Sequence, residues 1–349
     1  MQRLSWLTIF IVLYIGSYAY GWSWLHTVTH LDMQQKIVRK NDEWCWERKH
    51  IPAFSQLIFS WNAFRPEKGY FTFWVQVRDK LTHHWYAWHR MAQWGKNIQR
   101  SFTNMTHRGT EFHYVRLELP GYHCADSFRI RITAHAGAVL NSLHHLAVNT
   151  VNLRIFASEI TNRALYKLPS VFIAQVPRRS QMIVKHPRFF TLCSPTSTSM
   201  LLSYLLKRDF KPKDVAQGVY DGGLQVYGSW PFNTAHAYEL SKGKFTFHVE
   251  RLRSFTQLHD YLKKSIPVIV SIRGPVKGGA LPYTKGHLLV VIGYDRKLRK
   301  IICHDPAFAS NKQTRVSYDL ADFLQAWERS RRLSYVAQPQ VLPKIIKNK

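Results

Sequence analysis

The chain has 349 residues, of which 46% are hydrophobic and 20% are charged. This composition suits one large or two ordinary globular domains and excludes a chain that is disordered as a whole. Lys and Arg number 49 against 21 Asp and Glu, so the formal net charge is +28, and a surface this basic attracts polyanions such as nucleic acid, anionic lipid or acidic envelope polymers.

The N-terminal segment is apolar and carries no charge over residues 4–20. A basic residue before it and the small-x-small triplet Ser17–Ala19 near its end predict a secretory signal peptide. The uncharged stretch continues to Leu25, which is long enough for an uncleaved membrane anchor; a buried helix is the third alternative. We expect residues 1–25 to be a signal peptide or anchor and the rest of the protein to be exported, so nucleic acid is not the expected partner.

Residues 40–165 are predicted to form one domain, in which the pattern from about Ser55 to Phe156 has the period of two that is typical of β-strands. Apolar side chains alternate in the runs 57–61, 70–78, 112–119, 128–133 and 150–156. Short strands separated by turns predict an all-β sandwich domain. Seven tryptophans fall in it: Trp44, Trp46, Trp61, Trp74, Trp85, Trp88 and Trp94. The alternation favours a place for them in the core, and the alternative is an exposed platform that stacks sugars.

The cysteines of this region are Cys45 and Cys124. An oxidising compartment permits a disulfide between them, and the sequence leaves open whether it forms.

The second half, residues 166–340, mixes helical and strand patterns. Helices are predicted at 194–207, 211–219, 233–241, 254–264 and 320–330, and strands at 245–251, 266–273, 287–294, 300–304 and 333–338. A helix followed by a sheet with an antiparallel hairpin indicates an α+β fold.

Cys193 lies at the predicted start of the first of these helices, where Ser194 is expected as the cap and Pro195 in the first turn. A thiol there faces the positive end of the helix dipole, which favours the thiolate. Taken alone, such a cysteine is more often a packing residue than a nucleophile.

The predicted strands 287–294 and 300–304 are close enough in sequence to form one hairpin. If Tyr294 pairs with Leu298, His287 lies directly opposite Asp305 on the same face, where a carboxylate can hold the imidazole in one tautomer.

Two other residues of this hairpin compete for a role. His304 is expected on the opposite face, which makes His287 the preferred base, and Cys303 is expected to be a small buried residue. The closely spaced ligand pairs of a zinc site are missing, so a metal is not expected. No cofactor is expected either, because catalysis by a cysteine, a histidine and an aspartate requires none.

Cys193, His287 and Asp305 together describe acyl-transfer catalysis, in which the base activates the thiol and the carboxylate orients the base. Gln181 is the best candidate for the side-chain donor to the oxyanion, with Gln175 as the runner-up.

At these residues the sequence resembles cysteine peptidase family thirty-nine, the papain-like fold of bacteriocin-processing peptidases. The shared features are Gln, then Cys-x-Pro-Thr-Ser at a helix start, then Gly-His before an apolar strand, then Asp-Pro. The resemblance covers about residues 165–340 and is nearest to the stand-alone, exported branch with an N-terminal β domain. It implies Cys193 as nucleophile, His287 as base, Asp305 as orienting residue and Gln181 as oxyanion donor.

Two departures from the family matter. Ser194 stands where the family commonly has glycine, which puts in doubt the backbone conformation near the oxyanion hole. No transporter domain follows, so cleavage of double-glycine leaders is not implied.

The sequence therefore predicts an exported, two-domain cysteine hydrolase, most simply a peptidase acting on a peptide or protein. The alternative is a non-enzymatic basic protein that binds an acidic envelope polymer or an anionic membrane surface and carries a decayed triad. The basic surface also has an ordinary explanation, a solvated face without a dedicated partner.

Overall fold

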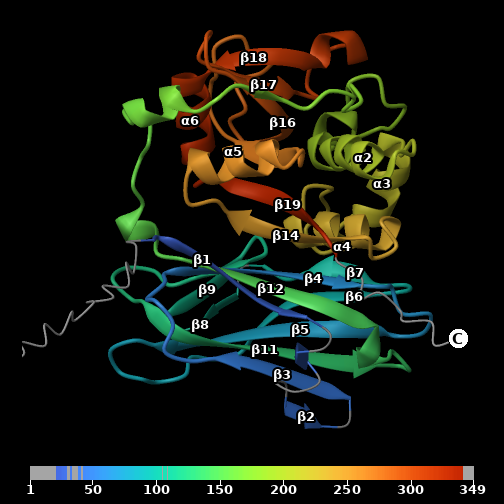
Figure 1. Ribbon diagram of the computed structural model, residues 1–349. Coiled ribbons are helices and arrows are strands. Elements are labelled where there is room, and N and C mark those ends of the chain that lie inside the picture. The colour runs from blue at the N-terminus through green and yellow to red at the C-terminus, as the bar shows by residue number, and fades with distance from the viewer. Residues whose placement is uncertain are drawn as a thin grey trace, which may run out of the picture.

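The computed structural model describes residues 21–29, 32–33, 38–40, 42–103, 105–107 and 109–340. The apolar segment 4–20, expected to be a signal peptide or anchor, lies outside the described residues. Among the described residues, no helix has the length and apolar character needed to cross a membrane. The fold is mixed α/β, in agreement with the expected α+β class, with a β domain below and a part containing helices and a third sheet above (Figure 1).

Two antiparallel sheets of six strands form the β domain. The first contains, in spatial order, β1 (Ser23–Thr29), β12 (Leu143–Val151), β4 (Gln56–Ala63), β10 (Arg116–Glu118), β9 (Thr110–His113) and β8 (Met105–His107). The second contains β2 (Val38–Lys40), β3 (Glu43–Arg48), β11 (Ala125–His135), β5 (Tyr70–Asp79), β6 (His89–Gly95) and β7 (Gln99–Ser101). Because β1 belongs to the first sheet, this domain begins before the expected start at residue 40.

The alternating apolar side chains hold the two sheets face to face. In β5, Phe71, Phe73, Val75 and Val77 are all buried, as the period-two pattern predicts. The ring of Phe73 lies 4.3 Å from that of Trp61 in the other sheet, centroid to centroid. The sandwich core is thus built from the inner faces of both sheets.

The seven tryptophans divide between the core and the outer surface. Trp44, Trp46, Trp61 and Trp94 are buried, as the alternation favours. Trp74, Trp85 and Trp88 are partly exposed and lie near arginine side chains instead.

Two predicted strands have different limits in the structure. The run 112–119 is broken into β9 and β10 by Tyr114 and Val115, whose φ values of 44° and 60° place them in the left-handed region of a two-residue hairpin turn. The run 150–156 is mostly not strand, because β12 ends at Val151 and a 3₁₀ turn follows.

The third sheet contains, in order, β14 (Phe245–Arg251), β19 (Leu333–Pro339), β15 (Val268–Ile272), β16 (His287–Asp295), β17 (Lys300–His304) and β18 (Arg315–Asp319), and the short β13 (Val171–Phe172) pairs with β16. Its helices are α2 (Cys193–Leu206), α3 (Pro212–Val219), α4 (Trp230–Leu240), α5 (Phe255–Lys263) and α6 (Leu320–Arg329). All five predicted helices and all five predicted strands of this part are confirmed, while β18 is not anticipated by the sequence.

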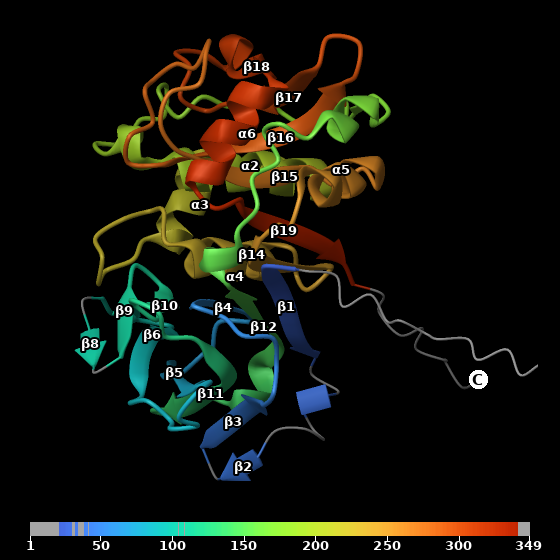
Figure 2. The same cartoon turned by 90° about the vertical axis from the view of Figure 1, so that its left-hand side faces the viewer.

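The β domain covers the free edge of the third sheet. Figure 2 shows β4 and β12 next to α4 and β14, with β11 and β3 farther away. Polar side chains on the outer face of the first sheet bind the backbone of the edge strand β14; they include Ser60, Asn62 and Asn149. These contacts satisfy backbone groups that an edge strand otherwise presents to solvent.

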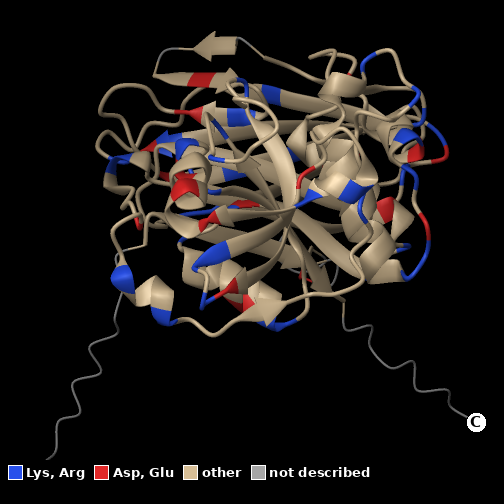
Figure 3. Cartoon of the chain, turned by 90° about the horizontal axis from the view of Figure 1, so that it is seen from above, with Lys and Arg blue, Asp and Glu red and all other residues tan. Residues whose placement is uncertain are grey.

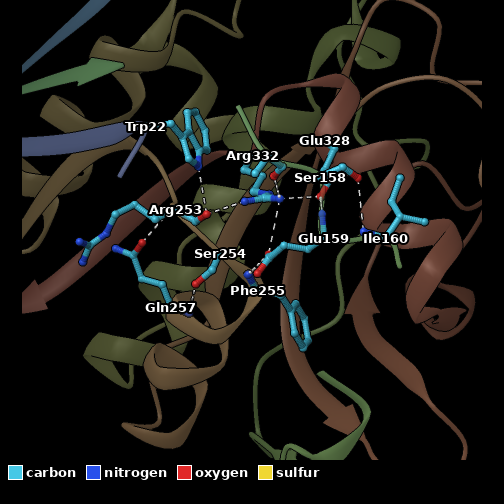
Figure 4. Close-up of polar contacts among 11 residues, drawn as sticks. Trp22, Ser158, Glu159, Ile160, Arg253, Ser254, Phe255, Gln257, Glu328 and Arg332 are labelled. Carbon is cyan, nitrogen blue, oxygen red and sulfur yellow. Dashed lines mark hydrogen bonds and ion pairs between the residues drawn. The ribbon is translucent and has the colours of Figure 1, made fainter. Parts of the chain in front are cut away.

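A buried arginine ties the connecting segment to the third sheet (Figure 4). Arg332 donates to Glu328 at 2.6 Å and to the carbonyl oxygen of Ala157 at 2.7 Å, and its Nη2 lies 3.6 Å from the carboxylate of Glu159. Ser158 completes the cluster by donating to Glu328 at 2.6 Å. The chain between the two parts is therefore held by charge-assisted hydrogen bonds.

Candidate active site

Cys193 is the first residue of α2 and is partly exposed. The N-cap is Leu192, so the expectation that Ser194 caps the helix is wrong: Ser194 is buried and its Oγ lies 3.0 Å from the hydroxyl of Tyr335. The 3₁₀ turn Phe189–Thr191 leads directly into α2, so the helix begins one residue earlier than expected. Pro195 lies in the first turn, as predicted.

The thiol of Cys193 is placed against the start of β16. Ser197, one turn along α2, donates to the carbonyl oxygen of Leu288 at 3.0 Å and so holds the helix on this strand. The thiolate form of Cys193 is stabilised by the ring of His287 and by the backbone N–H groups of Leu288 and Ser194. Burial raises the pKa of the Cys193 thiol, but these donors outweigh burial and bring the pKa below its ordinary value.

His287 and Asp305 form a buried pair. Nε2 of His287 lies 2.7 Å from Oδ1 of Asp305, and both side chains are almost entirely shielded from solvent. Burial alone lowers the pKa of His287, but the Asp305 carboxylate reverses this and holds the pKa well above its ordinary value. The arrangement favours a thiolate beside an imidazolium.

The register of the hairpin differs from the predicted one. Tyr294 pairs with Ile301 rather than Leu298, because residues 296–299 form a four-residue turn. The register also shifts between Val291 and Gly293. His287 is therefore not directly opposite Asp305, and the two side chains meet diagonally, which the spacing of an antiparallel pair allows.

Asp305 has further partners that the sequence does not reveal. Tyr283 and Tyr318 both donate to its Oδ2, at 2.6 and 2.7 Å, and the backbone N–H of Ala307 donates to its Oδ1 at 2.9 Å. Burial raises the pKa of Asp305, but His287 and these donors lower it overall. Tyr318 lies on the unpredicted β18 and Tyr283 in the loop before His287, so no local pattern connects either residue with the carboxylate.

Gln181 lies next to the residues that precede the nucleophile, but its amide is engaged. Nε2 donates to the carbonyl oxygens of Phe189 at 3.2 Å and Phe190 at 2.9 Å. Its backbone N–H donates to the carbonyl oxygen of Pro306, at 2.9 Å. Gln181 thus contacts the segment just before Cys193 and the residue just after Asp305, and its amide donor is engaged by carbonyls of the protein itself. The runner-up, Gln175, is exposed in a turn with φ of 65°.

The remaining candidates of the hairpin lie apart from this group. Nδ1 of His304 lies 3.2 Å from the carbonyl oxygen of Pro177, and Cys303 is fully buried, with burial raising its pKa. All four cysteines are free thiols, so Cys45 and Cys124 form no disulfide in this structure. No group of three or more His, Cys, Asp or Glu side chains in the described part of the chain is arranged to hold a metal ion.

Residues 173–335 match the model of the Peptidase_C39 like family, and this range includes Gln181, Cys193, His287 and Asp305. A search of curated proteins gives no match to the chain.

Proposed function

Residues 173–335 belong to the Peptidase_C39 like family, and from this membership we propose that the protein is an active cysteine peptidase with a papain-like catalytic domain. The observation that carries the proposal is that His287 is paired with the Asp305 carboxylate at 2.7 Å and also lowers the pKa of the Cys193 thiol. A peptide or protein is the substrate, and the Cys-His-Asp triad needs no cofactor.

The proposed reaction proceeds in two halves. The Cys193 thiolate attacks the carbonyl carbon of the scissile amide and forms a C–S bond, while the imidazolium of His287 gives its proton to the leaving nitrogen as the C–N bond breaks. His287 then removes a proton from water, whose oxygen attacks the thioester and displaces the Cys193 sulfur. Asp305 holds the imidazole and stabilises its charged form throughout.

The negative charge on the carbonyl oxygen needs two donors in this scheme. The backbone N–H of Cys193, at the start of α2, is the first. Gln181 supplies the second once its Nε2 turns from the carbonyls of Phe189 and Phe190 toward the substrate. The negatively charged oxygen of the bound substrate is a better acceptor for this amide than the two neutral carbonyls of Phe189 and Phe190.

Export is part of the proposal and is supported by the apolar segment 4–20 that follows a basic N-terminus. The net charge of +28 favours an acidic substrate, or an anionic surface to which the protein binds while it acts. Figure 3 shows Lys and Arg distributed around the molecule rather than gathered in one place.

The second candidate function is binding of an acidic envelope polymer without catalysis. It is favoured by the outer face of the second sheet, where the Arg129 guanidinium lies 3.9 Å from the Trp85 ring centroid and Arg131 lies 4.4 Å from that of Trp88. Alternating cations and indoles suit an anionic sugar chain. Under this alternative, Cys193→Ala leaves the biological function unchanged, whereas under the enzyme proposal it abolishes turnover without unfolding the protein.

The decisive experiment is the rate of Cys193 alkylation by iodoacetamide between pH 4 and 9, read by mass spectrometry. The proposal predicts fast labelling well below the free-thiol pKa of about 8.5, and its loss in His287→Ala. His304→Ala is the matched control, because His304 is buried on the neighbouring strand and binds Pro177 instead. Labelling of the parent only above that pKa, with no effect of His287→Ala, would falsify the enzyme proposal.

A further inference from the structure

We propose that Tyr283 is a positioning residue of the triad, whose ring and hydroxyl hold His287 and Asp305 in place, so that Cys193 is activated only when the loop 274–286 is seated. This inference rests on the proposed function. It gives the loop before His287 a role beyond connecting two strands.

The Tyr283 ring covers the base. It stacks on the imidazole of His287 with a centroid distance of 4.5 Å and an interplanar angle of 12°. Tyr283 itself is only 5% exposed. A parallel ring at this distance restricts rotation of the imidazole and shields the His287–Asp305 hydrogen bond from water, which strengthens the bond.

The Tyr283 hydroxyl is fixed in one direction. It accepts a hydrogen bond from the backbone N–H of Ala280 at 2.9 Å and donates to Oδ2 of Asp305 at 2.6 Å. With the Ala280 donor on one side, the single hydroxyl hydrogen points at the carboxylate. Oδ1 of Asp305 is left to face His287, so the hydroxyl helps to set the rotation of the carboxylate about its own axis.

The loop is shaped around this tyrosine. The carbonyl oxygen of Tyr283 accepts from the backbone N–H groups of both Gly274, at 3.1 Å, and Gly286, at 3.0 Å, which closes the loop at its base. Tyr283 has φ of 47°, in the left-handed region that a tyrosine seldom adopts. A Cβ at Gly279 would lie 2.8 Å from Cγ1 of Val276 and 2.9 Å from Cε2 of the Tyr283 ring, so the loop as it stands has no space for a side chain there.

Asp305 has two tyrosine donors, and they differ in the element that carries them: Tyr318 lies on a strand and Tyr283 lies on a loop. Tyr318 also donates to Oδ2 of Asp305, but it belongs to β18, which is held along its length by pairing with β17. Tyr283 reaches the same oxygen from a loop with left-handed glycines at 274, 278 and 286. Displacing this loop removes the stack on His287 and one hydrogen bond of Asp305 at the same time.

The test compares the pH profile of Cys193 alkylation in Tyr283→Ala, Tyr283→Phe and the parent. Tyr283→Ala is expected to move the acidic limb of the profile toward the free-thiol pKa of about 8.5. It should also slow the labelling of Cys193 at pH 7 at least about tenfold. A tenfold change corresponds to roughly 1.4 kcal/mol, the free energy of about one hydrogen bond or ring contact. Tyr283→Phe keeps the ring and is expected to restore most of the parent profile. Leu281→Ala, a change to an exposed side chain of the same loop, is the matched control and should behave as the parent.

Gly279→Ala provides a second variant that leaves Tyr283 unchanged. Its added methyl group crowds both Val276 and the Tyr283 ring and so disturbs the seated loop. It is expected to shift the acidic limb in the same direction as Tyr283→Ala, and a thermal unfolding curve checks that the variant is still folded. A parent-like limb in both Tyr283→Ala and Gly279→Ala overturns the inference while leaving the proposed function intact. A parent that labels as a free thiol overturns the proposed function, and this inference with it.

Discussion

Asn62 of β4 and Phe247 of β14 are joined by two hydrogen bonds across the boundary between the β domain and the third sheet. Nδ2 of Asn62 donates to the carbonyl oxygen of Phe247 at 2.6 Å, and its Oδ1 accepts from the backbone N–H of Phe247 at 2.8 Å. The amide thus occupies both backbone groups of one edge residue, as a neighbouring strand would. Asn62 is fully buried, so water cannot take its place.

Replacing this amide is expected to destabilise the protein without disturbing the triad. Asn62→Ala leaves a buried N–H and a buried carbonyl unpaired and should lower the free energy of unfolding by about 2 to 4 kcal/mol. Chemical denaturation measures this change, and Cys193 alkylation in the native state should keep the parent rate. The exposed Asn141→Ala is the control; equal stability of the two variants would show that the interface bonds contribute nothing.

Asp305 offers a test of the orienting carboxylate. Asp305→Asn retains the shape of the side chain but removes the charge that raises the His287 pKa, so turnover should fall roughly 10²- to 10⁴-fold. The measurement is kcat/KM on a peptide substrate, together with the alkylation rate of Cys193. Asp322→Asn on α6 serves as the control for loss of one carboxylate, and an Asp305→Asn protein with parent-like turnover would contradict the role.

The Arg332 cluster predicts an asymmetric effect of mutation. Arg332→Ala leaves Glu328 buried without its cation and should cost about 3 to 5 kcal/mol of unfolding free energy. Adding Glu328→Gln to Arg332→Met should recover part of this loss, because the Glu328 charge is then no longer buried without a cation, while Glu159 still loses its arginine neighbour. Thermal and urea unfolding measure both effects. Arg331→Ala, whose side chain is exposed, should change stability by less than about 0.5 kcal/mol, and a similarly mild Arg332→Ala would disprove the argument.

Buried histidines predict that the fold weakens in acid. Burial lowers the pKa of His89, His145 and His304 to about 4 each, against about 6.5 in the unfolded chain. A lowered folded-state pKa gives stability that is complete above pH 6.5 and is lost as the pH falls toward 4. Each pKa unit corresponds to about 1.4 kcal/mol.

The melting temperature should therefore fall steeply between pH 6.5 and pH 4. His145→Gln, which removes one of these groups, should make the fall smaller, whereas the exposed His84→Gln should leave its size unchanged. An unchanged pH dependence in His145→Gln would mean that other groups, such as the buried carboxylates, govern the acid limb.

Local patterns account well for the secondary structure. The alternation in β5 and β11 arises because successive side chains of a strand point to opposite faces, and the buried face of each is apolar. The helices α3, α5 and α6 follow from apolar spacing near 3.6 residues. The predictions fail at turns: Val115 in a left-handed conformation is contrary to its own preference, and only the pairing of β9 with β10 stabilises it there.

The sequence by itself was enough to select the candidate catalytic residues: a cysteine at a helix start, and a histidine and an aspartate on strands near in the chain. Each of these features depends on local helix or strand character. Tertiary structure alone decided how they meet. The register of β16 against β17, the closeness of Tyr283 and Tyr318 to Asp305, and the engagement of the Gln181 amide depend on packing between segments far apart in sequence. No periodicity within one segment encodes such contacts, since their free energy comes from burial and hydrogen bonding that exist only once the segments have assembled.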